Sequence, residues 1–426
     1  MYKPVNVVEV KLWGETIGAV ALDSVSGYYA FEYSRNWGSK YNIAPLTMPA
    51  STEVYVFPSL PETTYKRLPA MLADALPDDF GNALIDAYLA KQGVPKESIT
   101  SLDRLAYMAN RSMGALEFKP SRSPKNTKAS AIAISQLVEG SRKALAGSFD
   151  GDREAEAAIL NIIQVGTSAG GARAKAVIAW NPKTEEIRSG QLAVESGFEH
   201  WLLKLDGVGK DSELGTGSDY GRIEYAYYLM ARKSGITISD SRLLEENGRA
   251  HFMTKRFDRD GNQKHHIQTL CAMNHLDYRQ RGTHDYSQYF LTILSLGLHV
   301  SYLIEAFRRM VFNVLMANCD DHTKNFSFIL KQAEDWEWGL APAYDVTHAY
   351  NPNGEWTYQH LMSVNGKFKD ITKKDLMALA DRFQVRDAKA IIEEVLEARG
   401  EWVKFSKLAG LNKDISERVM QDFAKI

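Results

Sequence analysis

The segment that decides the fold is Asn318-Cys319-Asp320-Asp321-His322-Thr323-Lys324-Asn325. It follows an apolar stretch with helical periodicity, 301–318, and it precedes a strand-like piece, 326–330. The pattern therefore predicts a polar loop that is held at both ends. Functional side chains are often found on such loops, because a rigid scaffold positions them.

Asp320 and Asn325 stand five positions apart in this loop. This spacing is typical of loops that transfer a phosphoryl group, in which the Asp accepts the proton of the attacking hydroxyl and the Asn binds Mg²⁺. Lys324 would then lie close to the transferred group. The alternative is a polar helix end in which Asp320 and Asp321 are capping acids.

Asp345 follows twenty residues after Asn325, at the end of another strand-like piece. Magnesium in nucleotide sites takes one or two protein carboxylates, and phosphate oxygens and waters complete its coordination. Asn325 and Asp345 are therefore the predicted metal ligands.

A glycine-rich segment stands upstream, before an expected strand at 175–180. Its backbone N–H groups can approach phosphate closely, because few side chains block them. It lacks the GxxxxGK[ST] pattern, and an ordinary turn is the alternative. The residues concerned are Ala169, Gly170, Gly171, Ala172, Arg173 and Lys175.

Lys204 lies inside an apolar strand-like piece, 200–205. Burial of an unpaired ammonium is costly, so nucleotide phosphates would be suitable partners. A lysine on the solvent face of an edge strand is the alternative. Glu224, on a predicted helix, is either a partner of Lys204 or a surface glutamate. Phe257 ends an expected strand and could form an apolar wall for adenine, or the strand could be an ordinary core strand.

The composition limits the other classes of function. The chain has 426 residues, enough for two or three folding units. Lys+Arg is 51 and Asp+Glu is 53, so the chain lacks the positive charge that non-specific nucleic-acid binding needs. Two cysteines make no disulfide framework and favour a reducing compartment. No signal peptide or membrane span is predicted, so we expect a cytoplasmic protein.

Composition and periodicity also suggest where the chain divides. The first part mixes strands and helices, and the last part is mostly helical. The expected segments are an N-terminal α/β subdomain at 1–120, a linker and loop at 121–153, a nucleotide-binding part at 154–275 and a helical lobe with the catalytic loop at 276–426.

The order of these features resembles the HipA-type serine/threonine kinases of bacterial toxin–antitoxin modules. The most specific matches are the Asp320–Asn325 loop and Lys255-Arg256-Phe257-Asp258-Arg259, and weaker ones extend over about residues 5–400. The resemblance implies an α+β, atypical protein-kinase-like fold, with a mixed α/β N-terminal lobe and an all-α C-terminal lobe.

The resemblance also implies ATP and Mg²⁺ as ligands. Asp320 would be the catalytic base, with Asp321 as the alternative, and Lys324 would assist it. Asn325 and Asp345 would hold the metal. The residues expected at ATP are Ala169, Gly170, Gly171, Ala172, Arg173, Lys175, Lys204, Lys255, Phe257, His322, Asn325 and Asp345.

In this family, autophosphorylation of a serine before the glycine-rich loop switches the kinase off. Ser168 matches that position, and Thr167 is adjacent. A phosphate there adds about −1.5 to −2 charges and would repel ATP. The family usually pairs with a HipB-like helix-turn-helix antitoxin, and contact with DNA would occur only through that partner. The protein substrate is not predicted.

Two other functions compete with this one. A metal-dependent phosphohydrolase or nuclease could use Asp320, Asp321, His322, Asp345 and His348, since two-metal hydrolysis needs several carboxylates at one site. A non-catalytic pseudokinase corepressor would keep the fold without phosphoryl transfer.

Overall fold

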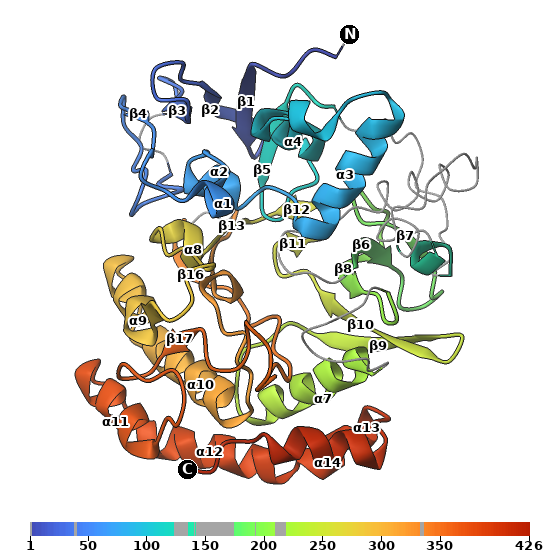
Figure 1. Cartoon of the computed structure of the whole chain (residues 1–426), viewed down its shortest axis with the longest axis vertical. Helices are drawn as coiled ribbons and strands as arrows, with labels where there is room; N and C mark the ends of the chain where they lie inside the picture. The colour runs from blue at the N-terminus through green and yellow to red at the C-terminus, as the bar shows by residue number, and fades with distance from the viewer. Residues whose placement is uncertain are drawn as a thin grey trace. The chain divides into compact units, whose positions relative to one another are not determined.

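The computed structural model describes residues 2–37, 41–122, 135–139, 141, 174–191, 193–208, 219–332 and 336–426. It divides the chain into two compact units (Figure 1). Unit 1 comprises Met1–Gly209, Thr254–Gln268 and Ile329–Glu337, and unit 2 comprises Lys210–Met253, Thr269–Phe328 and Trp338–Ile426. The expected glycine-rich loop and the expected helix at 154–165 lie outside the described residues.

Unit 1 begins with an antiparallel five-stranded sheet of order β4-β3-β2-β1-β5. Along β1, Val8, Val10 and Leu12 are buried and alternate with more exposed residues, as the period of a half-buried strand requires. The strands are β1 (Val7–Leu12), β2 (Glu15–Leu22), β3 (Tyr29–Tyr33), β4 (Val54–Tyr55) and β5 (Leu116–Lys119).

Two helices of unit 1, α3 and α4, begin at side-chain caps. Asp78 accepts a hydrogen bond from Gly81 N at 2.7 Å and starts α3, as its acids and proline predict. Thr100 and Asp103 form a capping box at the start of α4. The helices are α1 (Glu62–Tyr65), α2 (Ala70–Ala73), α3 (Asp79–Lys91), η2 (Lys96–Ser98) and α4 (Ser101–Met108).

A second antiparallel group in unit 1 has the order β7-β6-β8, and a short hairpin pairs β11 with β12. β6 is buried along its whole length, as expected of an apolar strand covered on both faces. The strands are β6 (Lys175–Trp180), β7 (Ile187–Ser189), β8 (Glu199–Lys204), β11 (Arg259–Asp260) and β12 (Gln263–Lys264).

Unit 2 is mainly helical. Helix α10 packs against α9 and α12, and α7 packs against α12 and α13. The helices are α7 (Tyr220–Lys233), α8 (Leu270–Met273), α9 (Tyr286–Ser295), α10 (Ser301–Leu315), η3 (Thr323–Asn325), α11 (Lys373–Arg382), α12 (Ala388–Gly400), α13 (Trp402–Leu408) and α14 (Lys413–Gln421).

Unit 2 also contains short strands, which an all-α lobe would lack. Strands β9 and β10 are neighbours in a sheet, and β14 pairs with β17 in parallel. The chain passes from one unit to the other within three strands, β10, β13 and β15. The strands are β9 (Ser241–Glu246), β10 (Arg249–Lys255), β13 (His266–Thr269), β14 (His284–Asp285), β15 (Ser327–Leu330), β16 (Trp338–Leu340) and β17 (Met362–Ser363).

Two details differ from the sequence prediction. Helix α10 ends at Leu315 rather than at residue 318, and Ala317 then adopts a φ of 51°, which no helix can continue. Helix α13 was not predicted. The four-segment division of the chain stays a prediction.

Within the described ranges, no helix is both long and apolar enough to cross a bilayer.

Candidate active site

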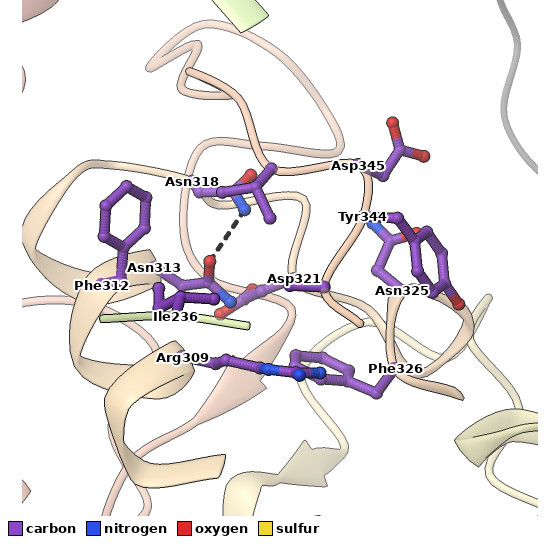
Figure 2. A pocket seen from close by; sticks show the side chains of 12 residues that line it. Ile236, Arg309, Phe312, Asn313, Asn318, Asp321, Asn325, Phe326, Tyr344 and Asp345 are labelled. Carbon is purple, nitrogen blue, oxygen red and sulfur yellow. Dashed lines mark hydrogen bonds between the residues drawn. The ribbon is translucent and has the colours of Figure 1, made fainter. Parts of the chain in front are cut away.

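The loop after α10 is fixed by hydrogen bonds to its surroundings in unit 2. Asn318 Nδ2 donates to Asn313 Oδ1 on α10 at 2.9 Å (dashed line in Figure 2). Cys319 N donates to the Ala349 carbonyl at 3.0 Å, and Ala349 N donates to the Ala317 carbonyl at 3.1 Å. The loop is therefore joined both to the helix before it and to the chain near Asp345.

The segment that carries Asp345 is held from two other directions. Arg309 Nη1, on α10, donates to the Ala341 carbonyl at 3.0 Å. Tyr344 OH donates to the Lys324 carbonyl at 2.6 Å, so the residue before Asp345 is bonded to the residue before Asn325. Asp345 itself has a φ of 55°, a conformation that aspartate tolerates better than most residues.

These contacts bring the predicted metal ligands to one small pocket of about 20 Å³. Asn325, Asp345, Asp321, Asn318 and Arg309 all line it, together with apolar side chains (Figure 2). Asn325 Nδ2 donates to the Asp320 carbonyl at 2.7 Å. This bond commits the amide nitrogen and leaves the amide oxygen of Asn325 as an acceptor or metal ligand.

The chemistry of this donor set fits Mg²⁺. One carboxylate and one amide oxygen are hard ligands, and the remaining positions on magnesium are normally filled by phosphate oxygens and water. Within the described parts of the chain, no group of three or more His, Cys, Asp and Glu side chains is arranged to hold a metal.

Asp320 lies beside this pocket with 37% of its side chain exposed. Trp356 Nε1 donates to Asp320 Oδ1 at 2.7 Å, and His322 Nε2 lies 3.7 Å from the same oxygen. Burial raises the pKa of Asp320, and the negative charges of Asp345 and Asp321 raise it further, whereas His322 and Trp356 oppose the rise. Asp320 is therefore a partly accessible carboxylate with enhanced basicity.

Asp321 has a different environment, although it is the next residue. Its side chain has no exposed surface. Oδ1 accepts from Leu361 N at 2.7 Å, and Oδ2 accepts from Tyr286 OH at 2.8 Å and bonds His360 Nδ1 at 2.9 Å. Its oxygens are thus engaged by three groups of the protein, which suits an anchor for the loop.

His360 is the charged partner of Asp321. Burial alone would lower the pKa of His360, but the neighbouring Cys319 and Asp321 hold this pKa well above its ordinary value. The charged form of the ring is therefore favoured in the folded protein. Replacing either partner would leave a buried charge without compensation, so the pair is a structural ion pair.

Lys324 and His322 flank Tyr278. Lys324 Nζ lies 5.0 Å from the centre of the Tyr278 ring, in the range of a cation–π contact. The rings of His322 and Tyr278 are 5.2 Å apart. The aromatic ring restrains both side chains beside Asp320, where the sequence predicts that they act.

Two of the lysines predicted at phosphate lie opposite each other in unit 1. Lys175 on β6 pairs directly with Lys204 on β8, so both side chains are on the same face of the sheet. Both residues are buried, with 4% and 8% of their surface exposed. The alternative of a solvent-facing Lys204 is therefore wrong.

Other predicted residues have partners of their own. Lys255 Nζ donates to Glu199 Oε1 at 2.6 Å. Phe257 follows β10 and is half-buried. Glu224 on α7 is buried, so the alternative of a surface glutamate is wrong. Ser168, Thr167 and the glycine-rich residues 169–173 lie outside the described residues.

The residues that the sequence analysis missed are those that support the two aspartates. Trp356 and His360 come from the irregular chain between Asp345 and β17, and no local pattern marks them. Tyr286 and Asn313 gave a weak signal, because each is a polar group on a strongly apolar helix. His348, a ligand in the hydrolase hypothesis, instead bonds Asp422 through Nε2 at 2.9 Å.

Comparison with known families matches this chain to two family models. Residues 8–119 match the HipA N-terminal domain, and residues 167–402 match the HipA-like C-terminal domain. The chain belongs to the HipA family. No curated protein is similar enough in sequence to count as a match.

The fold is similar to that of HipA from Shewanella oneidensis MR-1, solved with HipB and its operator DNA. The two share 17% identity over 97% of this chain and 94% of that one, with a TM-score of 0.67. The Helicobacter pylori proinflammatory kinase CtkA matches 52% of this chain and 91% of its own, at 13% identity and a TM-score of 0.33, which is too low to support an argument. The predicted HipA-type, mixed α/β fold is confirmed.

Proposed function

We propose that this HipA family member is an ATP- and Mg²⁺-dependent serine/threonine protein kinase. The observation that carries the proposal is the convergence of Asp320, Asn325 and Asp345. Asn325 and Asp345 line one pocket, and the charge of Asp345 acts on Asp320. Phosphoryl transfer needs little more from the protein than positioning and charge stabilisation, which such a site supplies.

In the proposed mechanism, Asp320 orients the substrate hydroxyl and accepts its proton. Its raised pKa improves it as a base, and its exposed surface leaves room for the hydroxyl. We assign this role to Asp320 rather than to Asp321, because the Asp321 oxygens already accept from three groups. Lys324, restrained against Tyr278, would stabilise charge on the transferred phosphoryl group.

Asn325 and Asp345 would hold Mg²⁺, which neutralises phosphate charge when it is bound. The bond from Asn325 to the Asp320 carbonyl couples the metal ligand to the base, since movement of one displaces the other. Lys175 and Lys204 would bind the nucleotide phosphates. Both residues are buried on the same sheet face, so they would present their side chains to the same phosphates.

We also propose the regulation and partner that the family implies. Autophosphorylation of Ser168 would add negative charge beside the ATP phosphates and oppose ATP binding. A HipB-like antitoxin would be the partner, and DNA would be reached through it. The HipA structure similar in fold contains both HipB and operator DNA, which supports this part of the proposal.

The decisive experiment is incubation of the purified chain with γ-labelled ATP and Mg²⁺, followed by mapping of the labelled residue. The expected result is label on Ser168 or Thr167. Asp320→Asn should lower the transfer rate by about 100-fold or more while ATP binding is retained. Release of free phosphate without labelled protein would instead favour a hydrolase, and wild-type transfer by Asp320→Asn would refute the assignment of the base.

A further inference from the structure

A second cavity, of about 170 Å³, lies within unit 1 and is lined by cationic and polar side chains. None of them belongs to the residues proposed above for ATP, magnesium or catalysis. They include Gln191, His200, Arg256, Arg259 and Lys264.

Positive charge exceeds negative charge around this cavity. Asp258 is fully buried and accepts from Arg256 at 2.9 and 2.6 Å and from Arg259 at 2.7 Å. Lys264 Nζ donates to Glu117 at 2.7 Å. Among the described residues, Arg256, Arg259 and Lys264 thus face two carboxylates, which leaves an excess of one positive charge. Arg256 uses Nε and Nη2 on Asp258, and in the described structure its Nη1 donates to no residue.

The excess charge is costly to the protein unless an anion offsets it. Arg256 has only 4% of its surface exposed. Burial, together with the charge of Arg256, lowers the pKa of Arg259 to about 10. Guanidinium groups so placed are suited to binding oxyanions, because they present several donors in a fixed plane.

His200 adds a feature that selects among anions. Its ring is buried, with 6% exposed, and Nδ1 lies 3.1 Å from the Gly190 carbonyl. A carbonyl only accepts, so Nδ1 carries the proton and Nε2 of the neutral ring is an acceptor. Within the described residues, Nε2 has no hydrogen-bond partner, and neither has Gln191 Oε1.

The neighbours of His200 keep its ring in this state. Burial and the charges of Arg256 and Arg259 lower the pKa of His200 to about 4, so the ring is neutral at pH 7. Gly190 cannot be replaced easily, since a Cβ there would lie 2.6 Å from the Ile178 backbone. The carbonyl that fixes the ring is thus held in place by close packing.

We propose that this cavity binds a phosphate group that carries a proton, either inorganic phosphate or a monoanionic phosphate monoester. The guanidinium groups of Arg256 and Arg259 would donate to its oxygens, and its P–O–H would donate to His200 Nε2. The amide of Gln191 can rotate to offer either its oxygen or its nitrogen. Sulfate has the same shape but no proton at pH 7, so one of its oxygens would face the His200 lone pair.

The test is calorimetric titration of the full chain at pH 7 in chloride buffer with inorganic phosphate, O-phosphoserine and sodium sulfate. One of the two phosphates should bind at least about tenfold more tightly than sulfate, since a buried acceptor left unpaired is costly. Tighter binding of inorganic phosphate would identify a free anion as the ligand, and tighter binding of phosphoserine would identify a phosphorylated side chain. Absence of phosphate binding at about 10 mM, or equal binding of sulfate, would overturn the proposal.

Two variants keep the test specific to this cavity. Gln191→Glu places a carboxylate at the cavity wall and should weaken phosphate binding about tenfold or more. Lys183→Glu is the control, because it makes a charge change of the same sign in the exposed turn before β7. It should change phosphate binding less than about twofold. His200→Phe should remove the preference for phosphate over sulfate. Unchanged phosphate binding in Gln191→Glu would also refute the site. Since Gln191 has no proposed role in phosphoryl transfer, labelled-ATP assays of that variant separate failure of this proposal from failure of the proposed kinase.

Discussion

The indole Nε1 of Trp356 donates a hydrogen bond of 2.7 Å to Asp320 Oδ1. The two residues are 36 positions apart, and both lie in unit 2. The bond favours the ionised carboxylate and opposes the burial that raises the pKa of Asp320. It also leaves the second carboxylate oxygen for a substrate hydroxyl, so Trp356 is a positioning residue for the proposed base.

Trp356→Phe should shift the pH dependence of phosphoryl transfer. Without the indole donor, the pKa of Asp320 rises further, so less of the base is ionised in acid. We expect the acid limb of the rate profile to move to higher pH than in the wild type, and the rate to approach the wild-type rate at pH 8. The measurement is the initial rate from labelled ATP between pH 5 and pH 8. Tyr358→Phe, an exposed aromatic on the same segment, is the matched control, and an unshifted profile for Trp356→Phe would contradict the role.

Asp321→Asn should reduce stability rather than chemistry alone. The substitution removes the charge opposite the His360 imidazolium in a fully buried site. A loss of about 3–5 kcal/mol in the free energy of unfolding is expected, measured by urea denaturation. Asp320→Asn provides the comparison, since its side chain is partly exposed and should cost much less. Equal stability losses in the two variants would argue against the division of roles.

The His360–Asp321 pair predicts a pH dependence of folding. The folded-state pKa of His360 is raised above its ordinary value of 6.5. The pair therefore contributes its full stability below about pH 6.5, and this contribution is lost as the pH rises through the folded-state pKa. The difference in unfolding free energy between wild type and His360→Gln should shrink as the pH rises above about 6.5. A difference that grows with pH would show that the ring is neutral in the folded state.

Lys204→Met tests the two opposed lysines. Loss of a charged donor to phosphate should weaken ATP binding by about tenfold or more. The stability of the unliganded protein is measured as well, so that a folding defect is not taken for a loss of nucleotide binding. Nucleotide titration and thermal unfolding measure the two effects, with Lys183→Met as an exposed control. ATP affinity equal to that of the control would exclude Lys204 from the nucleotide site.

Asp345→Asn should alter the requirement for magnesium. With the carboxylate gone, the concentration of Mg²⁺ that gives half the maximal transfer rate should rise by about tenfold or more. The rate at saturating Mg²⁺ should recover in part, because Asn325 and the nucleotide phosphates still bind the metal. A variant that loses activity with no change in the Mg²⁺ requirement would speak against metal binding by Asp345.

The elements with strong local signals were predicted well. The proline and acids at 77–79 predicted the start of α3, and the apolar strand at 175–180 is β6 with the same bounds. The end of α10 was predicted less well, because the apolar pattern continues through Val314 and Leu315 to Met316 and Ala317. Its end is set by the conformation of Ala317 and by the bonds of the loop to Ala349, which are distant in sequence.

The amino-acid sequence by itself determined the candidate base and metal ligands, because Asp320, Asn325 and Asp345 occur at a spacing that phosphoryl transfer requires. It favoured Asp320 over Asp321 only by the five-residue spacing to Asn325, since two adjacent aspartates otherwise have the same local pattern. Tertiary structure gives the two carboxylates different environments. It buries Asp321 against Tyr286 and His360 and leaves Asp320 partly exposed beside Trp356. The environment of a carboxylate, rather than its position in the chain, determines whether it can accept a proton from a substrate.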